Sequence, residues 1–209
     1  MTGLLLTTLL LPLAVAILLL VGRGVFSQSL ARNLALVGAL ATLVFSLMLA
    51  SEYMKIPANA APRSGVQPRF VKTFHWMSYG DPSQDVAGQP QLEFDFLLGL
   101  DGVSVSLIVL TTLLTVSCVL VSWEAITDRA PGFYACLLLL ETGLVGVFSA
   151  FDLVLFYVFF EFTLVPLFFM IGIWGGPDRR YAAVKFFLYT FTGSMVTLVG
   201  LVALMLVAS

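Results

Sequence analysis

The chain has 209 residues, of which 60% are hydrophobic and only 11% are charged, and its formal net charge is −2. Soluble domains are about 45–50% apolar and about 25% charged, so this composition excludes an ordinary soluble domain, and its low polarity excludes a disordered chain. With no basic excess, nucleic-acid binding is not expected, and the length suits several bilayer-spanning helices of roughly 20 residues each.

Six apolar segments are candidates for membrane-spanning helices, at residues 3–22, 31–50, 99–122, 132–149, 151–174 and 183–208. The first has no basic residue before it and no small-residue cleavage pattern after it, so we interpret it as a retained helix rather than a signal peptide. The sequence therefore predicts an all-α, polytopic membrane protein. Two helices fall in residues 1–50 and four in residues 99–209, with a long extracytoplasmic loop at 51–98.

The loop at 51–98 is the water-soluble part of the sequence. Hydrophobic and polar residues alternate in two stretches, around Phe74 and around Phe94, although His75 lies one position out of register. A period of two is typical of β-strands. A short hairpin on the membrane surface and an irregular interfacial loop both fit this pattern.

Basic residues predict how the chain is oriented in the membrane. The three short loops that share one side carry five arginines, Arg23, Arg32, Arg129, Arg179 and Arg180. The long loop on the other side carries four basic residues. Because the positive-inside rule weights short loops most strongly, we expect the arginine loops in the cytoplasm and both termini outside.

Glu161 is the strongest functional candidate, because it lies near the middle of the fifth span. A charge at that depth costs about 2.5–3.5 kcal/mol and usually marks an ion or proton path. A buried carboxyl group near a lysine can bind and release protons near neutral pH. Pro166 also leaves the carbonyl of Phe162 without its helical partner, so that it can hold a water. We favour proton carriage over a static ion pair beside a packing kink.

Two further ionisable residues lie inside predicted spans, Lys185 and Glu141. Lys185 shares one helical face with Tyr181 and Tyr189, which indicates a hydrated inner face, and snorkelling to the membrane surface is the alternative. Glu141 lies at mid-depth, where both proton transfer and a structural hydrogen bond are consistent with its position. Glu124 ends the third span, and its position alone makes it an interfacial residue.

Other polar residues have simpler interpretations. Asp101 and Asp152 each precede a predicted helix and are expected to cap it. Cys118 and Cys136 lack Cys-x-x-Cys spacing and the sequence has one histidine, so neither a metal site nor a disulfide is predicted. A polar stripe in the third span either packs on neighbouring helices or lines a file of water. It consists of Ser104, Thr111, Thr115, Cys118 and Ser122.

Three segments carry a resemblance to a known family: GLDGVSVSLIVLTTLLTVSCVLVSWE, LVLFYVFFEFTLVPLFFMIGIWGG and YAAVKFFLYTFTGS. They resemble membrane chain M, also called subunit 4, of proton-translocating NADH–quinone oxidoreductase (respiratory complex I), over about residues 92–207. The resemblance implies an antiporter-like complex I subunit fold. It implies that Glu161 is central to proton transfer and that Lys185 is the family's sixth-helix lysine. It matches Glu124 to a third-helix glutamate and Asp152 to the residue that opens the fifth helix, and it gives Glu141 no role.

The resemblance implies a membrane-arm subunit that contributes to proton translocation coupled to NADH oxidation by quinone. It places the chain in a bacterial inner (plasma) membrane or an equivalent energy-transducing membrane. No cofactor is expected in this chain, because NADH, FMN, iron–sulfur clusters and quinone would bind to partner subunits. The expected partners are the other membrane-arm subunits, especially neighbouring antiporter-like chains, and the lipid bilayer.

Family members continue into a second inverted repeat and a lysine on a broken helix, neither of which this sequence contains. A fragment, a split subunit and a truncated product are all consistent with that difference. Two alternative functions remain open. One is a subunit of an Mrp-type cation/proton antiporter, and the other is a truncated helical scaffold without transport activity.

Overall fold

The structure is a computed structural model that describes residues 2–24, 26–55, 69–79 and 92–208. Its helices are α1 (Thr2–Val21), α2 (Gln28–Met54), α3 (Gly102–Ala125), α4 (Ala130–Ser149), α5 (Leu153–Trp174) and α6 (Arg179–Ala208), with a short 3₁₀ turn η1 (Gly22–Gly24) after α1. All six long helices in these ranges are long and apolar enough to cross a membrane. This confirms the prediction of an all-α, multi-pass membrane protein.

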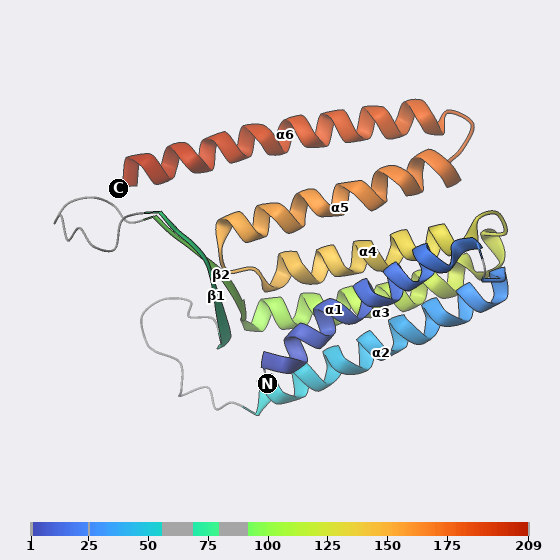
Figure 1. The fold of residues 1–209 in the computed structure, drawn as a ribbon, viewed down its shortest axis with the longest axis horizontal. Helices are drawn as coiled ribbons and strands as arrows, with labels where there is room; N and C mark the ends of the chain where they lie inside the picture. The colour runs from blue at the N-terminus through green and yellow to red at the C-terminus, as the bar shows by residue number, and fades with distance from the viewer. Residues whose placement is uncertain (1, 25, 56–68, 80–91, 209) are drawn as a thin grey trace.

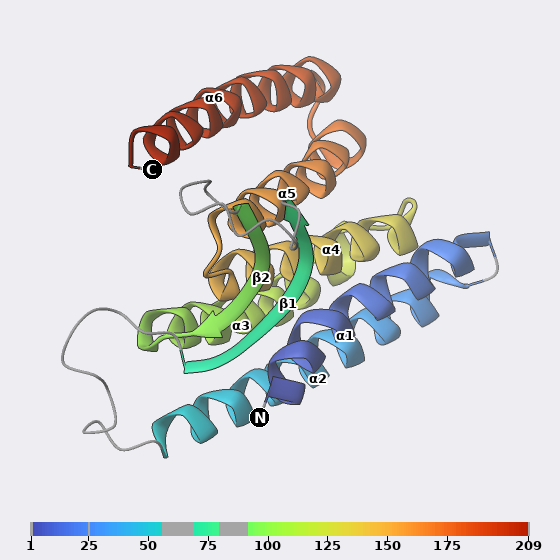
Figure 2. The same ribbon diagram turned by 60° about the vertical axis from the view of Figure 1, so that its left-hand side comes forward.

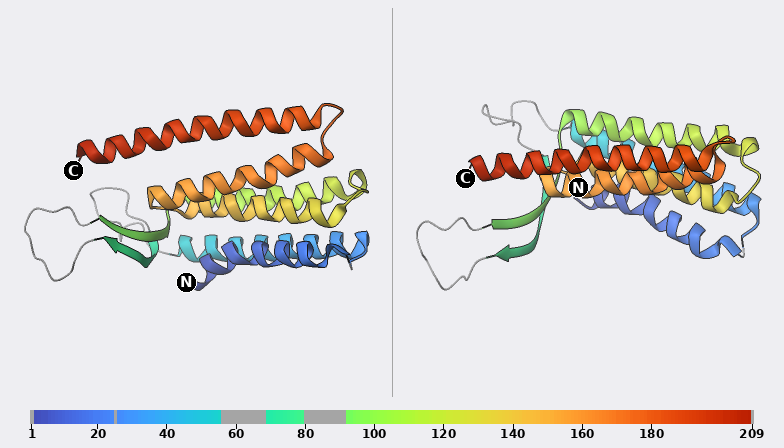
Figure 3. Two further views of the ribbon diagram at one scale, coloured as in Figure 1. Left: turned by 45° about the horizontal axis from the view of Figure 1, so that its top comes forward. Right: turned by 90° about the horizontal axis from the view of Figure 1, so that it is seen from above.

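The first four helices form a bundle, and the last two extend from it as successive layers. α1 packs on α2 and α4, α3 packs on α2 and α4, α5 packs on α4, and α6 packs on α5 (Figure 1). Burial falls from α4 to α6. Of the most apolar stretch of each helix, 61% is buried in α4, 22% in α5 and 6% in α6. α6 is the outermost layer (Figure 3).

Small and hydroxyl-bearing residues let the helices of the bundle approach one another. At Gly38 of α2, an added Cβ would lie 3.0 Å from the side chain of Val15 on α1. The hydroxyls of Ser46 on α2 and Thr112 on α3 share a hydrogen bond of 2.8 Å in the buried interior. Close backbone approach and hydroxyl bonds are what hold helices together where hydrophobic burial offers no preference.

Two strands follow α2 in the chain, β1 (Arg69–Tyr79) and β2 (Leu92–Leu100), and they pair antiparallel (Figure 2). The register shifts between His75 and Met77. A shift of this kind leaves one residue of β1 without an opposite partner. This register shift lies next to His75, where the alternation of hydrophobic and polar residues in the sequence is also irregular.

The strand pair is attached to the turn between α4 and α5. Leu98 of β2 forms an isolated bridge to Ala150, and the backbone N–H of Phe151 donates to the carbonyl of Leu97 at 2.9 Å. The turn that starts α5 is therefore held by backbone hydrogen bonds. We call this end of the bundle the hairpin end, and the opposite end, formed by η1 and the α3–α4 and α5–α6 loops, the arginine end (Figure 1).

The helix boundaries differ from the predicted spans by a few residues. α2 starts at Gln28 and continues to Met54, and α6 starts at Arg179, because helices continue past the apolar core into the interface until a cap or turn ends them. Residues 99 and 100, predicted to open the third span, belong to β2, and Asp101 then caps α3. Of the predicted long loop, residues 56–68 and 80–91 lie outside the described residues.

Candidate functional site

Glu161 lies in the middle of α5 and faces α6. Its side chain is partly buried, and its carboxylate accepts a short hydrogen bond from the hydroxyl of Ser194 on α6. The hydroxyl of Tyr157, one turn earlier on α5, interacts with both Glu161 and Ser194 and donates to the sulfur of Met195 at 3.6 Å. An ionisable group and two hydroxyls therefore meet at one point of the α5–α6 interface.

The Ser194 hydroxyl has two acceptors within reach. Besides the Glu161 carboxylate, its oxygen lies 2.9 Å from the backbone carbonyl of Phe191. A hydroxyl carries one proton and can direct it to only one acceptor at a time. Ser194 can therefore donate a hydrogen bond to an ionised Glu161. When that carboxyl is protonated, the hydroxyl can turn its proton to Phe191 and accept a hydrogen bond from Glu161.

α5 runs without interruption through Pro166, which is buried. Proline has no N–H, so the carbonyl of Phe162, four residues earlier, has no i+4 donor. That carbonyl belongs to the residue directly after Glu161. Pro166 therefore removes the regular helical donor of the carbonyl beside the glutamate, and water binding at that carbonyl stays a prediction.

Two glycines of α4 set the position of α5. An added Cβ at Gly146 would lie 2.3 Å from the ring of Phe159, and one at Gly143 would lie 2.7 Å from the side chain of Thr163. No side chain larger than a hydrogen fits these contacts without movement. The close α4–α5 packing determines which face of α5 turns towards α6, and hence where Glu161 points.

Lys185 is not brought to Glu161. It lies on the exposed side of α6, with its ammonium 5.5 Å from the ring centre of Tyr181 and 5.9 Å from that of Tyr189. The predicted shared face with the two tyrosines is present, and none of the described residues covers it, since Tyr181 is 69% and Tyr189 71% exposed. Whether it is a hydrated inner face stays a prediction.

Glu141 is 1% exposed and lies on α4, with neither carboxylate oxygen hydrogen-bonded. The structural hydrogen bond offered as an alternative for Glu141 is not formed within the described residues. Its side chain lines a cavity between α3 and α4, whereas Glu161 faces α6. The two glutamates therefore lie at different helix interfaces.

The remaining acidic candidates lie at helix ends. Asp152 caps α5, with its carboxylate accepting from the N–H of Leu155 at 2.9 Å, and Asp101 caps α3 by accepting from Ser104 at 2.6 Å. Both capping predictions are confirmed. Glu124 is exposed near the end of α3, at the arginine end, whereas Asp152 lies at the hairpin end.

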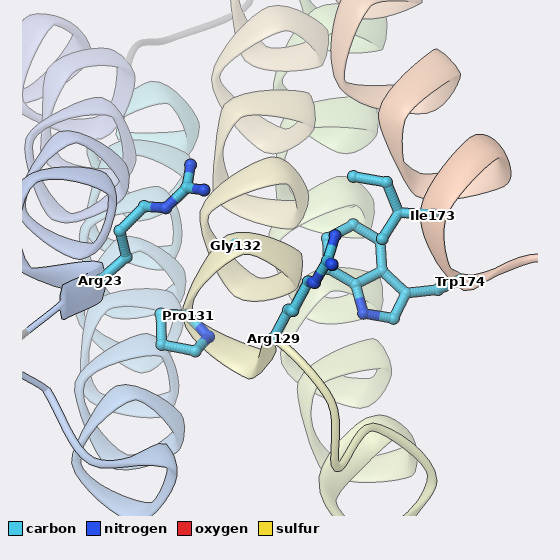
Figure 4. A pocket seen from close by; sticks show the side chains of 6 residues that line it. All are labelled: Arg23, Arg129, Pro131, Gly132, Ile173 and Trp174. Atoms are coloured by element: carbon cyan, nitrogen blue, oxygen red, sulfur yellow. The ribbon is translucent and has the colours of Figure 1, made fainter.

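The five arginines of the short loops gather at one end of the bundle, as predicted. Two of them share a cavity of about 480 Å³, which is lined by Arg23, Arg129, Pro131, Gly132, Ile173 and Trp174 (Figure 4). Arg129, Arg179 and Arg180 border an adjoining cavity of about 280 Å³. Arg32 joins them by donating to the carbonyl of Ile126 at 3.0 Å. Which side of the membrane this end faces stays a prediction.

In the part of the chain that the structure describes, no three His, Cys, Asp or Glu side chains lie close enough together to hold a metal ion. Ser194 and Tyr157 are the members of the Glu161 site that sequence reasoning did not identify. Their residue types are common in membrane helices, and their role depends on how α5 and α6 face each other.

Comparison with known proteins assigns this arrangement to a class. A family model described as the transmembrane region of NADH:quinone oxidoreductase/Mrp antiporter matches residues 150–209, which hold α5 and α6. Two solved structures share the fold. The match to an archaeal membrane-bound sulfane sulfur reductase covers 94% of this chain and 36% of the reductase chain, with a TM-score of 0.71 and 15% identity. The match to the Mrp complex from Dietzia covers 93% of this chain and 18% of the Dietzia chain, with a TM-score of 0.66 and 21% identity. The class is that of antiporter-like membrane subunits.

Curated relatives narrow the class to a family. NADH-quinone oxidoreductase subunit M from Rhodobacter capsulatus is 39% identical over 95% of this chain, and NADH-ubiquinone oxidoreductase chain 4 from Chondrus crispus is 38% identical over 95%. F(420)H(2) dehydrogenase subunit M from Methanosarcina mazei is 33% identical over 85%. The chain belongs to this subunit M and chain 4 family. It spans about a third of the length of these relatives, 35%, 36% and 32% respectively.

Proposed function

We propose that this chain is a membrane-arm subunit of an NADH–quinone oxidoreductase and contributes to proton translocation driven by NADH oxidation with quinone. The observation that carries the proposal is Glu161, a carboxyl group at mid-helix whose hydrogen-bond donor lies on a different helix. Its location in the segment that the family model matches supports the same assignment. The chain would act in a bacterial inner (plasma) membrane or an equivalent energy-transducing membrane.

Glu161 would accept a proton and pass it on, and Ser194 would adapt to both states. An ionised Glu161 accepts from the Ser194 hydroxyl, and a protonated Glu161 donates to it while that hydroxyl turns to Phe191. Each state of the carboxyl then has a hydrogen-bond partner, so neither is penalised by an unmet polar group. The Phe162 carbonyl offers a water-binding point beside the carboxyl.

The other acidic residues would extend the route towards both membrane surfaces. Glu124 lies at the arginine end and Asp152 at the hairpin end, so they would serve opposite ends of the path. Glu141 would hold protons at the α3–α4 interface. Lys185 would contribute its charge on the face of α6 that carries Tyr181 and Tyr189. Adjoining antiporter-like chains of the membrane arm would be its partners.

Redox chemistry would belong to partner subunits. The names of the relatives carry different electron donors, NADH in two of them and F(420)H(2) in the third, although all match this chain at 33–39% identity. A membrane subunit shared between donors is expected to serve the proton path rather than the donor. We therefore propose that NADH, FMN, the iron–sulfur clusters and quinone bind outside this chain.

The test replaces Glu161 by glutamine in the assembled complex and measures NADH-driven proton uptake by inverted membrane vesicles. Glu161→Gln keeps the shape and removes the titratable group, so pumping should fall at least tenfold. The matched control is Glu52→Gln, because Glu52 lies near the end of α2 and pairs with Lys55 at 2.5 Å. Rates are normalised to assembled complex, and Glu161→Asp should retain part of the activity. Pumping at the wild-type rate in Glu161→Gln would falsify the proton-carrier role.

A subunit of an Mrp-type cation/proton antiporter is the second candidate, favoured by the description of the matching family and by the fold shared with the Mrp complex. It differs in its driving force. An antiporter exchanges cations for protons without any electron donor. Sodium-driven proton movement in vesicles that lack NADH would support the antiporter and contradict the oxidoreductase proposal.

A further inference from the structure

A cavity of about 130 Å³ lies between α3 and α4, away from the Glu161 site. Four leucines line it, together with four residues that can take part in polar chemistry, which are Thr111, Thr115, Cys118 and Glu141. Both helices contribute residues from their middle turns, so the cavity lies deep in the membrane region. Cys118 is exposed, and on its side the cavity would be shielded by lipid or an adjoining subunit.

Glu141 is the unusual member of this wall. It is 1% exposed, and both of its carboxylate oxygens lack a hydrogen-bond partner among the described residues. A buried polar group without a partner costs several kcal/mol, and a buried charge costs more. Among the residues that the structure describes, no lysine, arginine or histidine lines the cavity, and Cys118 is the other titratable group in its lining. The carboxyl group therefore needs a partner that the cavity itself can hold.

The threonines of α3 restrict what that partner can be. Thr111 donates its hydroxyl proton to the carbonyl of Leu107 at 2.8 Å, and Thr115 donates to the carbonyl of Thr111 at 3.0 Å. With their protons used in this way, both oxygens can only accept. An ionised Glu141 also only accepts. The wall thus presents acceptors to a space that fits a few waters, at about 30 Å³ each.

From this geometry we propose that the α3–α4 cavity is a hydrated proton-holding site, in which Glu141 exchanges a proton with waters bound by Thr111 and Thr115. Water supplies the hydrogen-bond donors that this wall of acceptors lacks. Because none of the described lining residues is basic, protonation is what neutralises the carboxylate of Glu141. When Glu141 is protonated, its O–H bond donates to a cavity water. When it releases the proton to that water, the ionised carboxylate accepts from the same water.

The site deepens the proposed proton translocation but rests on different residues from the Glu161 site. Gly143 and Gly146 of α4 pack directly against α5, whereas Glu141 lines the space next to α3. Loss of pumping in Glu161→Gln therefore leaves the α3–α4 site untouched. Equally, an inert Glu141 leaves the role of Glu161 standing.

The experiment is infrared difference spectroscopy of the assembled complex, in which the Glu141 band is assigned by subtracting the Glu141→Gln spectrum. We expect a carboxyl band that titrates with pH and shifts promptly on transfer to D₂O. Thr115→Val removes one acceptor and should slow the exchange several-fold. Thr190→Val is the matched control, because its hydroxyl also donates within its own helix, to Phe186 at 2.8 Å, but lies on α6. If Glu141→Gln does not assemble, Glu141→Asp assigns the band by its changed frequency.

Each result has one meaning. A titrating, exchangeable band that slows in Thr115→Val supports a hydrated proton-holding site, and the same band in the Glu161→Gln background shows that it is independent of the Glu161 site. A band that neither titrates nor exchanges means a dry cavity with a fixed carboxyl and overturns the proposal. A band that responds to Na⁺ at constant pH means a metal-cation site and overturns it as well.

Discussion

Lys185 and Ser194 lie on opposite faces of α6, so this helix presents a hydroxyl rather than an ammonium to Glu161. The two residues are nine positions apart, and at about 100° per residue they project about 180° apart. Ser194 is buried against α5, while Lys185 lies between two exposed tyrosine rings. Among the described residues, the groups that contact Glu161 are therefore polar and uncharged.

Removal of the Ser194 hydroxyl should slow proton pumping without abolishing it. A hydrogen bond to a charged group contributes about 1.5–3 kcal/mol, so Ser194→Ala should lower the NADH-driven rate by about tenfold. Ser194→Thr keeps the hydroxyl and should retain most of the rate. Thr197→Val is the control on the same helix, since its exposed hydroxyl donates to Gly193. Equal pumping in Ser194→Ala and the wild type would show that the contact with Glu161 has no part in proton transfer.

Lys185 should act independently of Ser194. Groups without shared partners usually give additive effects, within about 0.3–0.5 kcal/mol. In a double-mutant cycle with Lys185→Gln and Ser194→Ala, we expect the two reductions in pumping rate to multiply. A large coupling between them would place the lysine's charge in the Glu161 site and contradict the separation of the two faces.

Sequence patterns predicted the helices and caps because these depend on local properties. A span needs a run of about 20 apolar residues. A carboxylate directly before a helix meets free N–H groups, and Asp101 and Asp152 both cap helices for this reason. The irregular alternation at His75 likewise coincides with the register shift in β1.

The contacts between helices could not be read from the sequence in the same way. In α5 and α6 apolar residues cover nearly every face, so helical periodicity does not indicate which side meets a neighbour. Packing decides it instead, through contacts such as Gly146 against Phe159. For this reason the sequence located Glu161 and Lys185 at membrane depth but did not reveal that Ser194 is the residue facing Glu161.

The contact between Gly146 and Phe159 should be among the most sensitive positions in the bundle. Gly146→Ala would place a methyl group 2.3 Å from the Phe159 ring, and overpacking of this kind costs about 1–3 kcal/mol. Gly193→Ala on α6 is the matched control, because no atom of the described residues lies within 4 Å of its added Cβ and alanine favours the helix. Thermal unfolding in detergent, followed by circular dichroism, should show a lower Tm for Gly146→Ala alone. A Tm equal to that of the wild type would mean that α4 and α5 separate at little cost.

Asp101 should make the stability of the chain depend on pH at its acidic end. The hydrogen bond from the Ser104 backbone N–H lowers the pKa of Asp101 below its usual 3.8. Since the folded pKa lies below the unfolded one, the ionised cap stabilises the fold above about pH 4, and this contribution is lost as the pH falls through the folded pKa. Asp101→Ala should therefore cost about 1 kcal/mol at neutral pH.

The difference between the wild type and Asp101→Ala should shrink on acidification, whereas Asp101→Asn, which caps without a charge, should keep its stability relative to Asp101→Ala at all pH values. Chemical unfolding in detergent between pH 7 and pH 3 measures these differences. A gap between the wild type and Asp101→Ala that stays constant across this range would mean that the ionised carboxylate is not what holds the start of α3, and that the tie between β2 and the α4–α5 turn fixes this end of the bundle instead.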